Sequence, residues 1–421
     1  MKKTMLILVS VDGNNNKFYY VELLNNGDLI KRWGRVGTKG REVIEKNMGE
    51  YAYNNIIKAK KAKGYKETEI NIDIKDDKVN VNLLDIAMEQ IKAIDKESKD
   101  LIKTLVKENI HNITSSTKIE YDIKTGYFST PLGIVTQKGV EKAKQLLNKI
   151  EKLFNNDQYK KSKRKEFQKL NEEYFTIIPT KIKNLREFEN LLINKEKIEE
   201  QSSICDALIS SIKIINSEKE KQKNKTKKVK EQIFDLKIEY LKDKKEIKRV
   251  KKYFEESKNK QHGRKTANAK VTKIYKINIG KEEKEYRKDF KNQMELWHGT
   301  KIANLLSILK SGLLMPKYSP GEATGYMFGM GLYFSNQSSK SMNYCDGMFW
   351  NNSKKRNKIY LFLADIAMGN YKVPNSATSK KPPKGYDSYW AKPNISGILN
   401  DEMIIFNNNQ IKLKYLLEIE L

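Results

Sequence analysis

The amino-acid sequence predicts an α+β protein built from three successive parts. Residues 4–45 read as strands, because aromatic and branched segments alternate there with turn residues. A helical pattern follows from residue 81 to residue 230, and mixed helix and strand patterns return from residue 233. We therefore expect a small antiparallel sheet, an all-α bundle and a mixed-sheet domain, in that order.

The composition limits the classes of protein. The chain has 421 residues, of which 32% are charged, and a formal net charge of +29. This charge indicates either a solvated lysine-rich surface or a polyanionic partner, since Lys and Arg that neutralise phosphates gain affinity by counterion release. Cys205 and Cys345 are the only cysteines and there are three histidines, without close pairs. We therefore expect no disulfide framework, no metal site and an intracellular location.

The N-terminal apolar run follows two lysines, as at the start of a signal peptide. The run covers only residues 5–9, and Asp12 follows soon after, so a first β-strand explains it better. No stretch approaches the roughly 18 apolar residues that are needed to span a membrane. We expect no membrane partner.

The first domain is expected at residues 1–80. Residues 18–33 read as two strands around a turn at residues 25–28, and a helix-like stretch covers residues 51–61. The second strand ends on a Trp-Gly-Arg motif. This arrangement resembles the WGR domain, a small antiparallel sheet with one packed helix.

Trp33 and Arg35 are the candidate DNA-binding residues. The resemblance implies that Trp33 packs on a sugar at a DNA end and that Arg35 bridges to neighbouring domains. Packing on a sugar requires no particular base, so it suits recognition of DNA strand breaks. The alternative for Trp33 is a core anchor, the ordinary role of a tryptophan beside a glycine in a sheet.

The second domain is expected at residues 83–230, after a charged linker at residues 65–80. Apolar residues recur there at spacings of three and four, which is typical of helices. With the segments at residues 130–133 and 176–179, Thr-Pro-Leu-Gly and Thr-Ile-Ile-Pro, the pattern resembles the helical regulatory domain of DNA-dependent poly(ADP-ribose) polymerases.

A basic run closes this region at residues 221–230. Such a run is ordinarily a solvated linker. A localisation signal, an extra DNA contact and a site of self-modification are the alternatives.

The third domain, expected at residues 233–421, contains four motifs in a fixed order. Leu-Trp-His-Gly-Thr ends at Thr300, a glycine- and aromatic-rich segment covers residues 325–334, Ser341 and Tyr344 follow, and Asp-Glu-Met-Ile-Ile-Phe ends at Phe406. One glycine-rich loop alone is weak evidence of a nucleotide site. Together the motifs resemble the NAD-binding signature and the His-Tyr-Glu triad of poly(ADP-ribose) polymerases. The resemblance implies a mixed-sheet ADP-ribosyltransferase domain with NAD+ as substrate.

The resemblance also implies which residues hold nicotinamide. Backbone groups of Gly299 would bind its carboxamide, because glycine allows a close approach, and the Ser341 hydroxyl would complete the clamp. Tyr344 would stack on one face of the ring. Tyr333 would pack against the other face and line the ribose.

Five further residues have implied roles in binding and transfer. His298 would hydrogen-bond the adenosine ribose, and Thr300 and Asn304 would contact the adenosine part. Glu402 would be the catalytic carboxylate: it would bind the 2′-hydroxyl of the nicotinamide ribose, orient the acceptor and stabilise the developing oxocarbenium charge. Lys340 would position Glu402. Taken singly, His298 would be an ordinary structural histidine and Glu402 a surface acid. Tyr333 and Tyr344 would ordinarily be core aromatics.

The expected activity is DNA-break-stimulated poly(ADP-ribose) synthesis on proteins, including the enzyme itself. The segment between Gly369 and Glu402 is shorter than is usual in the family, which leaves mono-ADP-ribosylation open. A DNA-break-binding scaffold with weak or no transferase activity is the other alternative. The location is expected to be the nucleus in a eukaryote and the cytoplasm or nucleoid in a bacterium, and the sequence gives no oligomeric state.

Overall fold

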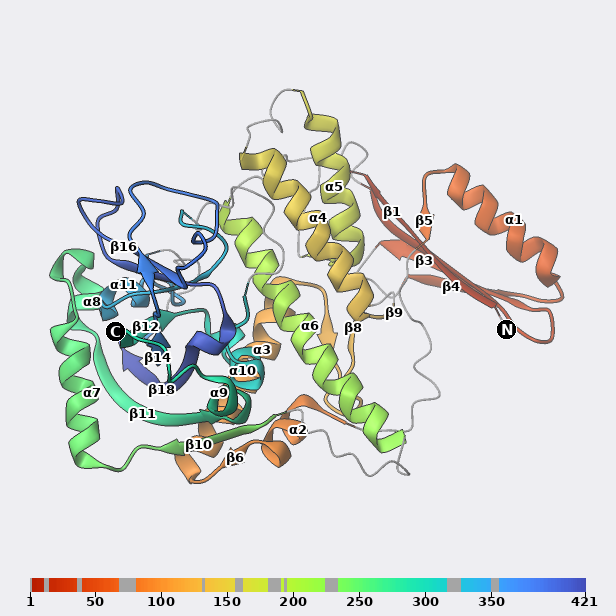
Figure 1. Ribbon diagram of the computed structural model, residues 1–421. Coiled ribbons are helices and arrows are strands. Elements are labelled where there is room, and N and C mark those ends of the chain that lie inside the picture. Colours follow the sequence, from red (N-terminus) through yellow and green to blue (C-terminus); the bar gives the residue numbers. More distant parts are fainter. Residues whose placement is uncertain are drawn as a thin grey trace. The chain divides into compact units, whose positions relative to one another are not determined.

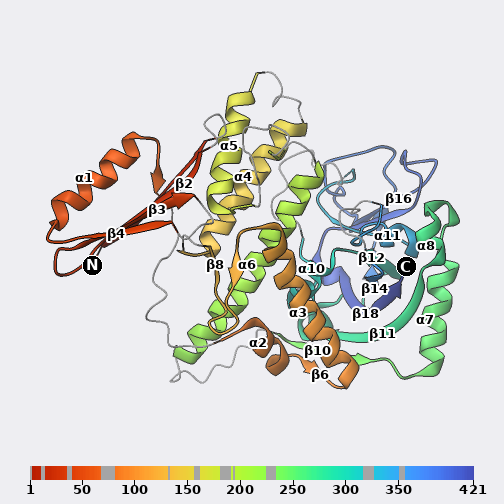
Figure 2. The same cartoon turned by 180° about the vertical axis from the view of Figure 1, so that it is seen from behind.

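The computed structural model describes most of the chain as two compact units. The described residues are 2–10, 15–35, 40–67, 81–130, 133–155, 162–180, 191–192, 195–223, 234–315, 327–349 and 356–421. The first unit consists of Met1–Leu83 with Ile110–Lys227, and the second of Leu84–Asn109 with Lys228–Leu421 (Figures 1 and 2). The units do not follow the three expected domains one to one, since Leu84–Asn109 belongs to the second unit. The expected ranges 1–80, 83–230 and 233–421 stay predictions.

The first unit contains a five-stranded antiparallel sheet in the order β4-β3-β2-β1-β5, with the helix α1 on one face. Its elements are β1 (Lys2–Ser10), β2 (Asn15–Leu23), β3 (Leu29–Arg35), β4 (Arg41–Glu45), β5 (Lys66–Glu67) and α1 (Gly49–Ala62). The predicted turn is present, and Gly27 adopts φ 84° in it, a conformation that favours glycine. Leu6, Val21 and Leu29 of the sheet pack with Tyr53 of α1 to form the core.

Helices make up the rest of the first unit. They are α4 (Gln137–Asn155), α5 (Arg164–Ile177) and α6 (Lys195–Lys223), and α4 packs against the other two. A small antiparallel sheet precedes them, formed by β7 (Glu120–Tyr121), β8 (Phe128–Thr130) and β9 (Gly133–Ile134). This small sheet was not predicted. Pro131, Leu132 and residues 224–230 of the basic run lie outside the described residues.

The second unit is organised around a six-stranded mixed sheet in the order β12-β14-β18-β11-β10-β6. Only its β10–β6 pairing is parallel. Its strands are β6 (Lys92–Ala93), β10 (Leu236–Tyr240), β11 (Lys270–Ile279), β12 (Gln293–Gly299), β14 (Lys358–Ala367) and β18 (Ile411–Glu420). The inner strand β14 is buried along nearly its whole length, as its continuous apolar run predicts.

A four-stranded sheet in the order β13-β17-β16-β15 completes the second unit. Its strands are β13 (Leu332–Phe334), β15 (Tyr371–Lys372), β16 (Ser388–Ala391) and β17 (Glu402–Ile405). A β-bridge between Trp297 and Ser335 joins this sheet to β12. The mixed sheets, the helices and the N-terminal antiparallel sheet confirm the predicted α+β class.

Seven helices accompany these sheets in the described part of the unit. They are α2 (Leu83–Gln90), the first part of α3 (Lys96–Ser116), α7 (Lys244–Glu256), α8 (Arg264–Asn268), α9 (Gly280–Glu285), α10 (Ile302–Ser311) and α11 (Ser338–Met342). The charged pattern of residues 241–257 predicts a helix, which is α7, and this helix packs against β11 (Figure 1). No helix in the described ranges is long and apolar enough to cross a membrane.

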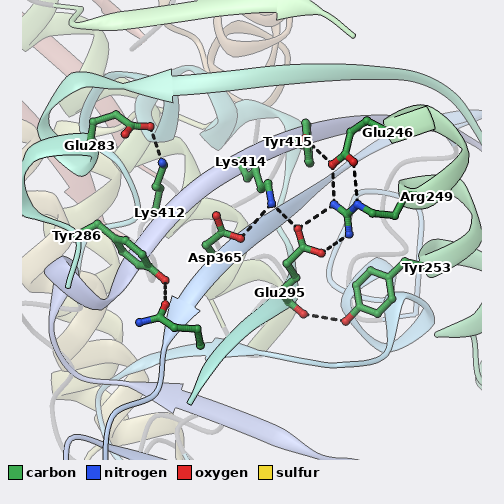
Figure 3. A network of polar contacts seen from close by, with 11 residues as sticks. Glu246, Arg249, Tyr253, Glu283, Tyr286, Glu295, Asp365, Lys412, Lys414 and Tyr415 are labelled. Carbon is green, nitrogen blue, oxygen red and sulfur yellow. Dashed lines mark hydrogen bonds and ion pairs between the residues drawn. The ribbon is translucent and has the colours of Figure 1, made fainter. Parts of the chain in front are cut away.

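Polar contacts fasten α7 to the six-stranded sheet (Figure 3). Arg249 pairs with Glu246 on its own helix at 2.7 Å and with Glu295 on β12. Lys414 of β18 lies 2.7 Å from Glu295, and the Tyr415 hydroxyl donates to Glu246 at 2.7 Å. Beneath them Trp297 is fully buried. The polar contacts of Glu295 and the burial of Trp297 hold β12 in place. The last residues of this strand belong to the candidate site.

Candidate active site

β12 carries His298 to its end, where the ring meets the strand β13. The Nδ1 atom of His298 lies 3.0 Å from the carbonyl oxygen of Tyr333. Because a carbonyl only accepts hydrogen bonds, Nδ1 carries a proton and Nε2 is the acceptor nitrogen of the neutral ring. Burial lowers the pKa of His298, although the bond to the Tyr333 carbonyl acts in the opposite direction. The neutral ring can therefore accept a hydrogen bond from a hydroxyl group.

Gly299 and Ser341 lie directly against each other. A Cβ atom on Gly299 would be 1.8 Å from the backbone oxygen of Ser341, so only glycine fits at this position. The Ser341 hydroxyl donates to the carbonyl oxygen of Trp297 at 3.0 Å. The close packing of α11 on the end of β12 thus requires glycine at position 299, which the sequence alone did not reveal.

Two tyrosines lie near this point in different surroundings. Tyr333 is half-buried, and its hydroxyl donates to the carbonyl of Gly329 at 2.9 Å and accepts from the backbone N–H of Phe328 at 3.0 Å. Tyr344 follows α11 and is 43% exposed, so its ring is accessible to a planar ligand. Gly325 and Tyr326 of the same motif lie outside the described residues.

Glu402 begins β17 and forms an ion pair with Lys340 of α11. The distance between Lys340 Nζ and Glu402 Oε1 is 2.7 Å, and the two side chains are only 14% and 16% exposed. Nζ also donates to the backbone oxygens of Asp401 at 3.1 Å and Asn400 at 3.3 Å. Burial lowers the pKa of Lys340, and the neighbouring Glu402 carboxylate opposes this effect. Three acceptors thus fix the ammonium and, with it, Oε1 of Glu402.

Thr300 and Asn304 lie at the start of α10. The Asn304 side-chain amide donates to the Thr300 hydroxyl at 3.1 Å, so the two residues form one polar group. Beside them, the buried side chain of Asn109 on α3 donates to the backbone oxygen of Ala303 at 3.0 Å. Sequence reasoning missed Asn109, since nothing in a helical pattern indicates which polar residue faces another element.

The loop before β17 contains two further contacts that the sequence analysis missed. The Trp390 indole N–H donates to Asp401 Oδ1 at 2.7 Å, and the side chain of Asn400 is held by residues 259–262. The only sequence signal for Asn400 is its place just before the Asp401-Glu402 motif. These contacts fix the start of the strand that carries Glu402.

The candidate DNA-binding residues lie on β3 in the other unit. Trp33 is partly buried and stacks on Tyr19, with ring centroids 6.0 Å apart and planes at 21°, while Arg35 is exposed. The Lys60 ammonium lies 3.8 Å from the centre of the Tyr19 ring. Burial first, and then the positive charges of Lys63 and Lys31, lower the pKa of Lys60. Positive charge therefore gathers around the Trp33 stack.

Comparison with known proteins assigns these parts to families. Residues 244–421 match the family described as "Poly(ADP-ribose) polymerase catalytic domain", residues 2–71 match "WGR domain", and residues 93–240 match "Poly(ADP-ribose) polymerase, regulatory domain". The chain belongs to the poly(ADP-ribose) polymerase family.

Individual family members match nearly the whole chain at low identity. Poly [ADP-ribose] polymerase 2 of Homo sapiens is 25% identical, and the match covers 99% of this chain and 79% of that protein. Poly [ADP-ribose] polymerase 2 of Zea mays is also 25% identical, with 97% of this chain and 69% of that protein covered. The match to poly [ADP-ribose] polymerase 1 of Gallus gallus covers 98% of this chain but only 44% of that protein.

Family membership makes the chain an NAD+ ADP-ribosyltransferase. The geometry fits NAD+ as substrate: the neutral His298 ring offers an acceptor nitrogen, Tyr344 offers an accessible ring face, and Glu402 offers a fixed carboxylate. Ribose hydroxyls and an aromatic pyridinium are matched by such groups. The roles of the individual residues stay predictions.

Proposed function

We propose that the chain is a DNA-break-stimulated transferase that makes poly(ADP-ribose) on proteins, including itself. The observation that carries this proposal is the buried Lys340–Glu402 pair at the start of β17. A carboxylate held by a lysine can orient a sugar hydroxyl and stabilise positive charge on the adjacent carbon. Elongation requires both functions, since the acceptor is then itself a ribose hydroxyl.

In the proposed transfer, the bond between nicotinamide and the anomeric carbon of its ribose breaks. The bonding electrons leave with nicotinamide, which departs as a neutral molecule, and the ribose acquires oxocarbenium character. The acceptor oxygen then forms the new bond to that carbon and releases its proton to solvent. Glu402 binds the 2′-hydroxyl through Oε2 while Lys340 holds Oε1, so the carboxylate keeps its orientation through the step.

The other site residues bind and orient NAD+ in this proposal. The backbone of Gly299 and the hydroxyl of Ser341 hold the carboxamide, and Tyr344 and Tyr333 enclose the ring. The Ser341 hydroxyl reaches the carboxamide by rotating away from the Trp297 carbonyl, to which it now donates. His298 accepts a hydrogen bond from the adenosine ribose through Nε2.

At the adenosine end, Thr300 and Asn304 act together. Their mutual hydrogen bond keeps both side chains at the start of α10. The Asn304 amide then retains a second N–H for a ligand acceptor, because an amide nitrogen carries two donors.

The WGR domain supplies the DNA-binding part of the proposal. Burial lowers the pKa of Lys60, and repulsion by the nearby Lys63 and Lys31 lowers it further. A phosphate bound among them would relieve this repulsion, which favours a nucleic-acid backbone as the ligand. Trp33 and Arg35 would contact the sugar and the neighbouring protein surface at the break.

One experiment tests the proposal as a whole. The purified chain is incubated with labelled NAD+, with and without nicked duplex DNA, and the products are resolved on a gel. We expect long, DNA-stimulated polymer attached to the chain itself. Single ADP-ribose units would support the mono-transferase alternative. The short segment before Glu402 favours this alternative. DNA binding without nicotinamide release would instead identify a scaffold.

The proposed site of action follows from the proposed substrate. An enzyme that responds to broken DNA acts where DNA is, which is the nucleus in a eukaryote and the nucleoid in a bacterium. Fluorescence microscopy of a tagged chain in its own cells, before and after DNA damage, tests this expectation.

A further inference from the structure

His262 ends a short 3-10 segment, η2 (Lys260–His262), and contacts residues next to both members of the ion pair of the candidate site. Its Nε2 atom is 3.1 Å from Oδ1 of Asn400, and its Nδ1 atom is 2.9 Å from the hydroxyl oxygen of Ser339. Asn400 lies two residues before Glu402, and Ser339 directly precedes Lys340. The imidazole therefore connects the chain segments that carry the two partners.

We propose that His262 is a positioning residue that holds the Lys340–Glu402 pair in place through Asn400 and Ser339. The inference rests on the proposed role of Glu402 in transfer. His262 itself touches neither member of the pair through a hydrogen bond, so its effect is transmitted by the loop before β17 and by the first turn of α11.

The hydrogen bonds around Ser339 select one tautomer of His262. The backbone N–H of Asn259 donates to the Ser339 hydroxyl oxygen at 2.8 Å. Ser339 is fully buried, so its own proton needs an acceptor, and Nδ1 of His262 supplies one. Nε2 must then carry the ring proton and donate it to Oδ1 of Asn400. In this tautomer both ring nitrogens of His262, the Ser339 hydroxyl and Oδ1 of Asn400 all have a suitable hydrogen-bond partner.

Asn400 passes this constraint to the ion pair. Its Oδ1 accepts from His262 and, at 3.4 Å, from the side chain of Asn259, while its backbone oxygen accepts from Lys340 Nζ. The next residue, Asp401, is held by Trp390 from the neighbouring strand. Both residues that lead into Glu402 are thus fixed by their side chains.

The other end of the connection is equally well fixed. The backbone N–H of Ser338 donates to the Ser257 carbonyl at 3.1 Å, and the Ser338 hydroxyl donates to the Phe254 carbonyl at 2.8 Å. The segment that carries His262 therefore moves with α11. A change at His262 would loosen the loop before β17 relative to α11, which is the relative position that the ion pair requires.

The charges around His262 favour the neutral ring. Burial lowers its pKa, the bond to Asn400 raises it, and the ammonium of Lys340 lowers it again. On the side of β17, Glu402 is paired with Lys340, and Asp401 is bonded to Trp390.

Charged residues near His262 in the chain do not oppose the preference for the neutral ring. Lys260 and Arg264 are exposed, and Lys258 is paired with Glu255 at 2.7 Å. Protonation of the ring would place a second N–H against the Ser339 hydroxyl, which would have to turn its own proton away from Nδ1. Acid should therefore weaken the connection, because the buried Ser339 hydroxyl proton then loses its acceptor.

The test compares the full-length variants His262→Ala and His262→Gln with wild type in NAD+ turnover on nicked DNA. His262→Ala should lower kcat roughly tenfold and change KM for NAD+ by less than roughly twofold, because the orientation of Glu402 and not the binding of NAD+ is affected. His262→Gln can donate to Asn400 but cannot titrate, so it should retain most of kcat at neutral pH. As the pH falls, kcat of His262→Gln should begin to decrease at a lower pH than kcat of wild type.

Further variants show whether the effect passes through Asn400. The double variant His262→Ala with Asn400→Ala should be no more impaired than the worse single variant, since both break one connection. Lys260→Gln, an exposed neighbour on the same segment, should behave as wild type.

Two results would overturn the inference: wild-type kcat in His262→Ala, or the same acid limb in His262→Gln and wild type. Glu402→Gln, assayed in parallel, separates this failure from that of the proposed function. An active Glu402→Gln variant would refute the proposed site. An inactive Glu402→Gln beside unaffected His262 variants would refute only the role of His262.

Discussion

Lys340 and Glu402 are 62 residues apart in the chain, yet their side chains meet at 2.7 Å in a largely buried ion pair. A buried charge that loses its partner is costly, so each residue constrains the other. The lysine uses its two remaining protons on the backbone that precedes Glu402. The pair thus orients the carboxylate and also fixes the strand that carries it.

Glu402→Gln should abolish most polymer formation while NAD+ binding is retained. The amide preserves the size of the side chain but removes the negative charge that stabilises the oxocarbenium, which is worth a loss on the order of 10²–10³ in kcat. Polymer length on a gel and NAD+ affinity by calorimetry are the measurements. Glu285→Gln, an exposed acid on α9, is the matched control. Full-length polymer from Glu402→Gln would contradict the assignment.

Tyr344→Ala should weaken the binding of benzamide-type nicotinamide mimics several-fold. The ring is 43% exposed, and a stacked aromatic face contributes about 0.5–1.5 kcal/mol beyond its buried area. Tyr344→Phe serves as the control, because it keeps the ring and removes only the hydroxyl. Calorimetric titration of both variants decides the matter. Equal affinities for Tyr344→Ala and wild type would mean that the ring does not contact the ligand.

The sequence was sufficient for the fold class and for the order of the motifs. A continuous apolar run predicts the buried strand β14, and a charged helical pattern predicts α7. The small sheet β7-β8-β9 was missed, because two-residue strands carry no periodicity.

The contacts within the site were harder to foresee. The clash that a Cβ atom on Gly299 would make with Ser341 depends on how α11 packs, and the bond from Asn109 to Ala303 joins residues 194 positions apart. The sequence gives no indication of a role for His262, because it is an isolated histidine without a close partner in the chain. Long-range packing of this kind leaves no mark on a single sequence.

Arg249→Met should destabilise α7 at neutral pH. Hydrogen bonds from Arg249 and Tyr415 lower the pKa of Glu246 to about 2 against the opposing effect of burial. Since the folded pKa lies below the ordinary 4.5, the resulting stability is present above pH 4.5 and is lost as the pH falls through about 2. Because Arg249 and Glu246 are partly exposed, we expect Arg249→Met to lower the free energy of unfolding by about 1–2 kcal/mol at pH 7.

Hydrogen exchange of the α7 amides measures this effect locally in the full chain. Arg249→Lys should be intermediate, since lysine keeps the charge but cannot bridge Glu246 and Glu295 with the same fork of donors. Lys252→Met, on the exposed side of the helix, is the control. Unchanged exchange in Arg249→Met would show that the network in Figure 3 adds no stability.

Glu282→Gln should remove a loss of stability that wild type shows as the pH rises from 4.5 to about 7. Burial raises the pKa of Glu282 to about 7, although the backbone N–H of Leu413 donates to it at 2.7 Å. With a folded pKa above the ordinary 4.5, stability is fully present below pH 4.5 and is lost as the pH rises to about 7. The free energy of unfolding should differ by up to about 3 kcal/mol between these two pH values.

The comparison to make is the pH dependence of exchange in α9 and β18 between pH 4 and pH 8, in wild type and variant, at roughly constant ionic strength. Wild type should lose protection as the pH rises, after correction for intrinsic exchange, and Glu282→Gln should not. Glu285→Gln, an exposed acid on the same helix, is the control. Parallel pH profiles for Glu282→Gln and wild type would refute the prediction.

Trp33→Ala should weaken binding to nicked duplex DNA and lower DNA-stimulated turnover, with basal turnover almost unchanged. The reason is that DNA binding and catalysis are proposed to be coupled through the helical region, and coupling between two sites acts only when the first is occupied. Because Trp33 also stacks on Tyr19, the variant needs a check on folding: hydrogen exchange of β2 and β3. Trp33→Phe keeps a ring in the stack and should retain the fold.

Two companion measurements separate DNA recognition from coupling. Lys60→Gln should reduce the steep salt dependence of DNA binding without disturbing catalysis, because each phosphate contact contributes roughly one counterion to the slope. Deletion of residues 83–230 would also remove β6 and the first part of α3, which belong to the unit of the six-stranded sheet. Deletion of residues 117–223 is the cleaner variant: it should raise basal turnover and abolish the response to DNA. A full-length enzyme that is equally active with and without broken DNA, at low salt, would refute the coupling and leave the transferase itself untouched.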